Sequence, residues 1–275
     1  MREYTGFASV YDMFMDNVPY DEWADYLHEL LLEKGIDKGI ICELGCGTGR
    51  ITGKLRDFGY DMIGIDISQE MLQIAADKEK KGVAGEIMYL NQDMREFELY
   101  GTVAAVVCIC DGMNYIMEKE DLLKVFRLVN NYLDPNGVFI FDMNTPYYYR
   151  KILGEQSICE NREEGSFIWE NYYDSETMVN EFDMTIYIRR NSEIKNVNAP
   201  SYRRNPKSKS ENSAPVYERF EETHYQKAYR INEVKMLLKR AGLKDIEVFE
   251  VLTHAAPKSN TERVYFISRE SGKMG

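Results

Sequence analysis

The sequence predicts an α/β fold, in which a mostly parallel sheet carries helices on both faces and a small antiparallel part is inserted. Up to about residue 145, short apolar segments alternate with amphipathic ones, a pattern typical of parallel sheets. The segment ELGCGTGR at 43–50 lies where the first strand should turn into a helix. Residues 151–225 instead contain longer segments rich in tyrosine and β-branched residues, which favour antiparallel strands.

Size and composition fit one large domain, or one domain with a sizeable insertion. The chain has 275 residues, of which 44% are hydrophobic and 29% charged, enough for an ordinary buried core. The formal net charge of -12 disfavours a general nucleic-acid binder, because phosphate binding requires a basic surface. We expect no membrane association, since no segment approaches the roughly 18 apolar residues of a membrane span, and the N-terminus lacks the apolar core of a secretory signal.

The cysteines indicate a reducing compartment. Their number is odd and several lie on predicted buried strands, which favours free thiols and a cytoplasmic protein. Cys108 and Cys110 have no partner pair at zinc spacing, so we expect no metal site. The five residues are Cys42, Cys46, Cys108, Cys110 and Cys159.

The expected elements of the first half follow one another with short connections. A helix over 20–35 has Leu27, Leu30 and Leu31 at helical spacing, and Asp21 can cap its start. Ser68 can cap a later helix whose apolar residues include Met71. The remaining elements are strands at 39–44, 61–66, 87–93, 102–110 and 138–144, helices at about 49–58 and 119–133, and a turn at 134–137.

The second half divides into an insertion and a return to the first pattern. Strands are expected at 166–174, 178–190 and 216–226, then a helix at 231–242 and strands at 245–251 and 263–269. Residues 191–214 are polar, contain proline and are locally basic. We expect them to form a flexible hairpin, which is either a solvated loop or an arm that guides substrate or RNA. We therefore expect a core domain of 1–150 and 226–275, and an antiparallel lid of 151–225.

The glycine-rich turn indicates a nucleoside ligand. Gly45, Gly47 and Gly49 allow the backbone to approach a ligand closely. In dinucleotide enzymes the pattern is G-x-G-x-x-G; here the third glycine comes one residue early and Arg50 stands where a small residue is expected. Asp66 ends the second strand and is placed to accept hydrogen bonds from ribose hydroxyls. This spacing alone leaves NAD and other nucleosides open.

Two further carboxylates favour a cationic nucleoside. Glu43 lies directly before the turn, where a negative charge would repel pyrophosphate and attract an ammonium or sulfonium. Asp93 follows the third strand, at the sheet edge where ligands of open α/β folds bind; it can accept the amine of adenine or cap a helical turn. Together with Asp66, these residues fit an adenosine that carries a cationic amino acid.

With these residues the chain resembles a known family. The segments ELGCGTGR, GIDIS, NQDM, CDGMNYI and LDPNGVFIFD are similar, in this order, to the motifs of class I S-adenosylmethionine (SAM)-dependent methyltransferases. The resemblance covers about residues 36–145 and the last helix and two strands. The start FASVYDMFMD and the insertion resemble small bacterial enzymes of this class. The resemblance implies a Rossmann-like seven-stranded sheet with a reversed last strand, SAM as cofactor and S-adenosylhomocysteine as product.

The resemblance also implies a set of cofactor-binding residues. The glycine turn lines the methionine part, Asp66 binds the ribose and Asp93 binds the adenine amine. Met71 equally fits the helix core, and Tyr11 equally fits core packing. The full set is Tyr11, Glu43, Gly45, Cys46, Gly47, Asp66, Ile67, Met71, Asp93, Met94, Cys110 and Asn114.

Catalysis of methyl transfer depends mainly on positioning. The reaction is a direct displacement, for which proximity and alignment contribute roughly 7–11 kcal/mol. A general base is needed only if the nucleophile must lose a proton. The candidates are Asp111, after the fourth strand, and His224 and Tyr225, at the end of the insertion; His224 also fits an ordinary strand histidine.

The sequence favours a small-molecule acceptor and a monomer or homodimer. Amino-methylating nucleic-acid enzymes of this fold carry Asn/Asp-Pro-Pro-aromatic after the fourth strand, whereas residues 111–115 here read DGMNY, and no Pro-Cys nucleophile motif is present. Two alternatives remain: an RNA-modifying methyltransferase that docks its substrate through the basic hairpin, and a nicotinamide- or nucleotide-binding protein. Glu43 and Arg50 argue against nicotinamide.

Overall fold

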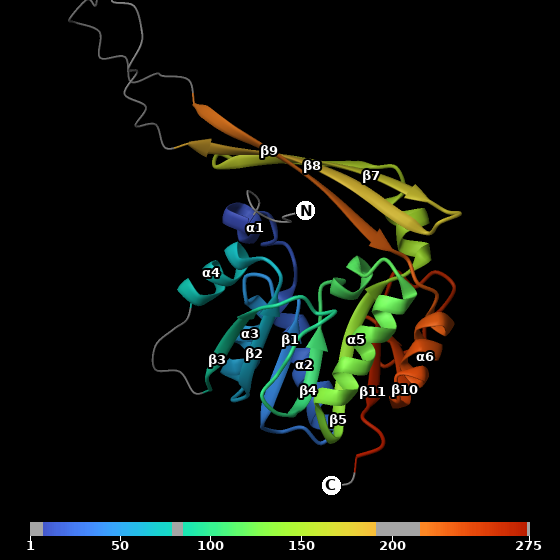
Figure 1. The fold of residues 1–275 in the computed structure, drawn as a ribbon. Helices are drawn as coiled ribbons and strands as arrows, with labels where there is room; N and C mark the ends of the chain where they lie inside the picture. Colours follow the sequence, from blue (N-terminus) through green and yellow to red (C-terminus); the bar gives the residue numbers. More distant parts are fainter. Residues whose placement is uncertain (1–7, 79–84, 191–214, 274–275) are drawn as a thin grey trace, which may run out of the picture.

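The structure is a computed structural model that describes residues 8–78, 85–190 and 215–273. Within these residues the chain forms two sheets, stacked one above the other in Figure 1. The larger has seven strands in the order β10-β11-β5-β4-β1-β2-β3. Their bounds are β1 Ile40–Leu44, β2 Asp61–Asp66, β3 Ile87–Asn91, β4 Val103–Cys108, β5 Leu133–Asn144, β10 Lys244–Glu250 and β11 Arg263–Arg269.

The direction of the strands confirms the predicted fold class. Strands β1 to β5 pair in parallel, whereas β11 is antiparallel to both β5 and β10. The carboxyl ends of β1, β2, β3, β4 and β5 therefore lie at one edge of the sheet, with the loops that follow them. In open α/β sheets this edge is where ligands bind.

Helices cover both faces of the large sheet because its central strands are apolar on both sides. Successive strand residues point to opposite faces: Ile140 packs with α2 (Tyr20–Glu33) and α3 (Arg50–Asp57), while Phe139 and Phe141 pack with α5 (Lys119–Tyr132) and α6 (Ile231–Arg240). Ser68 caps α4 (Gln69–Asp77) as predicted, with its Oγ accepting from the N–H of Met71 at 3.3 Å.

The smaller sheet, which we call the lid sheet, lies across the carboxyl edge of the larger one (Figure 1). It is antiparallel in the order β6-β7-β8-β9, with bounds β6 Ser157–Asn161, β7 Gly165–Asp174, β8 Val179–Arg190 and β9 Val216–Lys227. Helix α1 (Ala8–Phe14) lies between the two sheets. The inner face of the lid sheet contributes Phe167 and Phe182 to a cluster with Phe14 of α1 and Tyr115.

Several local predictions need correction. Asp21 does not cap α2, whose N-cap is Pro19; Asp21 pairs instead with Lys54. Strand β5 begins at Leu133 and includes the predicted turn, where Asn136 has a φ of 62°. Helix α1, strand β6, the 3-10 turn η1 (Gly112–Tyr115) and the π-helical turn η2 (Tyr148–Leu153) were not predicted.

The hairpin predicted at 191–214 lies outside the described residues. Among the helices that are described, none is long and apolar enough to cross a membrane.

Candidate donor and acceptor site

The glycine turn joins β1 to α3 and leaves room beside its backbone. Gly45, Gly47 and Gly49 have φ values of 69°, 53° and 73°, a region that residues with a Cβ rarely adopt. A Cβ on Gly49 would lie 2.5 Å from the hydroxyl oxygen of Tyr89, whereas one on Gly47 would meet no atom within 4 Å. The turn therefore packs tightly at Gly49 and faces open space at Gly47, as a cradle for a ligand requires.

Asp66 at the end of β2 is held by the turn itself. Its Oδ2 accepts from the N–H of Gly47 at 2.8 Å, and its Oδ1 accepts from the N–H of Ser68 at 2.8 Å. The carboxylate thus has a fixed orientation beside the glycines. Next to it Ile67 is exposed, while Met71 is buried in the packing of α4, which agrees with the helix-core alternative for Met71.

Glu43 lies beneath the turn and supports the start of α3. The N-cap of α3 is Gly49, which has no side chain to offer, and the hydroxyl of the buried Thr52 donates to Glu43 instead. Burial, with a smaller contribution from the nearby charge of Asp66, raises the pKa of Glu43 to about 8, although the hydrogen bond from Thr52 lowers it. Glu43 is therefore a buried acid that a cationic ligand would help to ionise.

Asp93 and Met94 lie on the other side of the turn. Asp93 accepts from the backbone N–H of Arg95 at 2.8 Å and from its guanidinium at 2.9 Å. Burial opposes ionisation of Asp93, but the hydrogen bonds from Arg95 hold its pKa below the ordinary value. Met94 borders the cradle, since its Cε lies 3.4 Å from the position of a Cβ on Gly45.

The N-terminal segment closes over the turn. Tyr11 is hydrogen-bonded to Tyr20 and lies near Cys110, and burial raises its pKa well above the ordinary value. Asp12 accepts from the hydroxyl of Thr48 at 2.7 Å. Tyr11 was predicted from the sequence to lie here, whereas its neighbour Asp12 was not.

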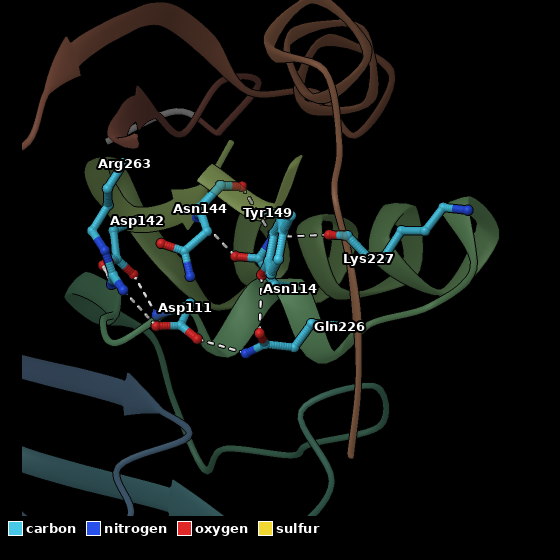
Figure 2. A network of polar contacts seen from close by, with 8 residues as sticks. All are labelled: Asp111, Asn114, Asp142, Asn144, Tyr149, Gln226, Lys227 and Arg263. Atoms are coloured by element: carbon cyan, nitrogen blue, oxygen red, sulfur yellow. Dashed lines mark hydrogen bonds and ion pairs between the residues drawn. The ribbon is translucent and has the colours of Figure 1, made fainter. Parts of the chain in front are cut away.

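Asp111 is the centre of a polar network between the two sheets (Figure 2). Its Oδ1 lies 2.7 Å from Nη2 of Arg263, and its Oδ2 accepts from Nε2 of Gln226 at 2.6 Å. Arg263 also pairs with Asp142, which is fully buried and accepts from the backbone N–H of Asp111 at 2.8 Å. Cys110 and Asp111 have φ values of 65° and 53°, so this network holds two consecutive residues in an unfavourable conformation.

Asn114 is placed as an anchor for the lid sheet. It is fully buried; its Nδ2 donates to the carbonyl of Lys227 at 2.8 Å, and its Oδ1 accepts from the N–H of Asn144 at 2.9 Å. These contacts join η1, β5 and the end of β9 (Figure 2). The structure therefore gives this residue a structural position rather than one on the surface of the cradle.

His224 and Tyr225 are separated by the lid sheet. His224 is only 1% exposed, stacks on Phe182 with 4.9 Å between ring centroids, and lies 3.2 Å from Glu222. Its ring also meets that of Tyr115 edge to face at 6.0 Å. Tyr225 is 40% exposed, because adjacent strand residues point to opposite faces. Tyr225 therefore does not share the inner face with His224, whereas Glu222, which was not predicted from the sequence, does.

Fold and site together define a class I SAM-dependent methyltransferase. Residues 41–137 match the family model described as "Methyltransferase domain". The chain is 32% identical to the "Putative methyltransferase YqeM" of Bacillus subtilis (strain 168), over 98% of this chain and 97% of that protein. The chain belongs to the SAM-dependent methyltransferase family, and its cofactor is SAM.

Two further comparisons agree with this assignment. A solved SAM-dependent methyltransferase from Clostridium acetobutylicum ATCC 824 superposes with a TM-score of 0.78, at 26% identity over 98% of this chain and 99% of that one. The "Glycine/sarcosine N-methyltransferase" of Halorhodospira halochloris is 26% identical over 50% of this chain and 51% of that protein. None of these comparisons supports the RNA-modifying or nicotinamide alternative.

Proposed function

We propose that the enzyme methylates an amino group of a small polar molecule that binds between the lid sheet and the carboxyl edge of the large sheet. The observation that carries this proposal is the buried His224 with its largely buried partner Glu222, on the inner face of the lid sheet beside Tyr115. Tyr115 belongs to η1, which directly follows the Cys110–Asp111 segment at the donor side. When bound, SAM supplies a methyl group activated by a sulfonium.

An amine acceptor fits the charges of this region. Alkyl amines carry a proton at neutral pH and must lose it before they can attack a methyl group. In the proposal, Asp111 attracts the cationic amine, His224 accepts its proton and Glu222 stabilises the resulting imidazolium. The relative named as a glycine/sarcosine N-methyltransferase supports this choice, because glycine and sarcosine are amines.

An acceptor screen tests the proposal directly. Purified protein is incubated with SAM and matched small amines and alcohols, and methylated products are measured by mass spectrometry. We expect methylation of at least one amine and a loss of roughly 10²–10⁴-fold in turnover for His224→Ala, the usual contribution of a general base. Tyr225→Phe, on the same strand but the opposite face, should retain activity. Methylation of alcohols alone, or full activity of His224→Ala, would contradict the proposal.

Other assignments remain proposals. We propose a core of 1–150 and 226–275 and a lid of 151–225, because the two sheets divide near these residues. A cytoplasmic location is supported by the five free cysteines. For the cofactor we retain, with Asn114 and Met71 in supporting positions, Tyr11, Glu43, Gly45, Cys46, Gly47, Asp66, Ile67, Asp93, Met94 and Cys110.

A further inference from the structure

A carboxylate of the chain itself occupies a site with several donors beside the glycine turn. Oδ1 of Asp12, on α1, accepts from the hydroxyl of Thr48 at 2.7 Å and from Nε of Arg50 at 3.0 Å. Nζ of Lys78, at the end of α4, pairs with Oδ2 of Asp12 and donates to the carbonyl of Thr48 at 3.1 Å. Three side chains, from the glycine turn, the start of α3 and the end of α4, thus converge on one carboxylate, an arrangement typical of anion recognition.

This cluster lies at the end of the cradle where a methionine part would bind. Thr48 and Arg50 flank Gly49, and Thr48 directly follows Gly47, which faces open space. The guanidinium of Arg50 lies over the ring of Tyr20, 5.2 Å from its centroid. Tyr20 is in turn hydrogen-bonded to Tyr11, which borders Cys110 at the end of β4. The cluster is therefore part of the same wall as the predicted donor residues.

The side-chain carboxylate of Asp12 carries the same negative charge as the carboxylate of an amino acid. Burial opposes its ionisation, but the hydrogen bonds from Lys78, Thr48 and Arg50 hold its pKa below the ordinary value. It is also not part of the hydrophobic cluster around α1, to which Phe14 and Tyr11 contribute. In the described part of the chain, the hydrogen-bond and ion-pair partners of the Asp12 carboxylate are the three donors of this cluster.

We infer that Thr48, Arg50 and Lys78 form the subsite for the carboxylate of the cofactor's methionine part, and that Asp12 occupies this subsite when the cofactor is absent. Binding of SAM then displaces Asp12 and loosens this contact between α1 and the glycine turn, while Tyr11 keeps its place through its hydrogen bond to Tyr20. The change reaches the lid sheet, because Arg162, which follows β6, holds Asp16 just after α1 at 2.7 Å and 2.8 Å.

The inference is tested by calorimetric titration with two ligands that differ at the methionine part. S-adenosylhomocysteine carries the amino-acid carboxylate, whereas 5′-methylthioadenosine lacks the amino-acid part. Asp12→Asn removes the competing charge, so affinity for S-adenosylhomocysteine should rise about fivefold, the scale of one partly exposed ion pair. Arg50→Gln should lower that affinity about tenfold, and Arg50→Lys should restore part of it. Affinity for 5′-methylthioadenosine should be unchanged in all three variants.

Asp25→Asn is the control, since it removes one negative charge at an exposed position on α2, away from the Thr48–Arg50–Lys78 cluster. It should leave both affinities unchanged. Thermal melting of each variant establishes that it is folded. Equal weakening of both ligands by Asp12→Asn would show that Asp12 only fastens α1, and equal weakening by Arg50→Gln would show that the turn is distorted; either result overturns the inference.

Discussion

Asp111 and Arg263 face each other across the edge of the large sheet, with 2.7 Å between Oδ1 and Nη2, although 152 positions separate them in the chain. Both side chains are largely buried, and Asp142, which shares the guanidinium, is fully buried. This relationship fixes the segment that follows β4 against the last strand.

Removal of Arg263 should therefore be costly. Arg263→Met leaves two carboxylates in a buried environment without their cation, and breaking such a pair typically costs about 3–5 kcal/mol. Arg190→Met is the control, because Arg190 forms an exposed pair with Glu218, for which about 0–1 kcal/mol is expected. Urea denaturation measures both variants. A similar small loss for both would show that the network contributes little to stability.

Substitutions in the glycine turn should separate stability from cofactor binding. Gly49→Ala places a Cβ against Tyr89 at a positive φ, so we expect a loss of about 1–3 kcal/mol in the free energy of unfolding. Gly47→Ala has strain but no clash; it should lower stability less and weaken S-adenosylhomocysteine binding more.

Gly53→Ala is the control for both glycine variants. Gly53 lies inside α3, its φ is not positive and a Cβ there would meet no atom, so about 0.5–1 kcal/mol of stabilisation is expected. Denaturation and calorimetry measure the three variants. Normal cofactor affinity in Gly47→Ala would contradict the assignment of the open side of the turn to the ligand.

Glu43 should make the stability of the free protein depend on pH. Burial raises its pKa to about 8 from an ordinary value of 4.5, so the native state binds the proton more tightly than the unfolded state. The stabilisation from this proton is fully present below about pH 4.5 and is lost as the pH rises through about 8. Glu43→Gln does not titrate there, so its melting temperature relative to the natural protein should rise between pH 5 and pH 8.5. Parallel profiles would contradict the raised pKa.

Asn114 should control how firmly the lid sheet is held. Asn114→Ala removes the hydrogen bonds to Lys227 and Asn144 and leaves buried backbone groups unpaired, at about 1–3 kcal/mol for each. Hydrogen exchange of β9 should become faster, whereas Asn91→Ala, at an exposed position, should leave β9 unchanged. Equal protection in both variants would show that other contacts hold the lid.

The elements that could be predicted from the sequence are those whose bounds depend on the local pattern of apolar and polar residues. Strands β2 and β11 match their predicted bounds, because their apolar residues are bounded by polar ones or by turns. Strand β6 was missed because its residues, SICEN, alternate between exposed and half-buried and carry little apolar signal. Helix α1 was missed because seven residues are too few for a clear helical period.

The candidate site was predictable only where a motif fixes it. Glu43 and the glycine turn lie next to each other in the chain, and Asp66 ends β2, which pairs with β1. Arg263 and Gln226 reach Asp111 from distant segments, and no spacing in the sequence reveals such contacts. The face of the lid sheet on which His224 or Tyr225 lies depends on strand register, which a one-residue shift reverses.

The attachment of β9 has a consequence for how new acceptors could be selected during evolution. Gln226 and Lys227 are hydrogen-bonded to the core, and His224 lies only two and three positions before them in β9. The proposed proton acceptor therefore lies at the end of β9 that is attached to the core. Substitutions towards the opposite end of the lid sheet can change which acceptors bind without affecting proton removal by His224. The range of acceptors and the rate of the chemical step can therefore evolve independently.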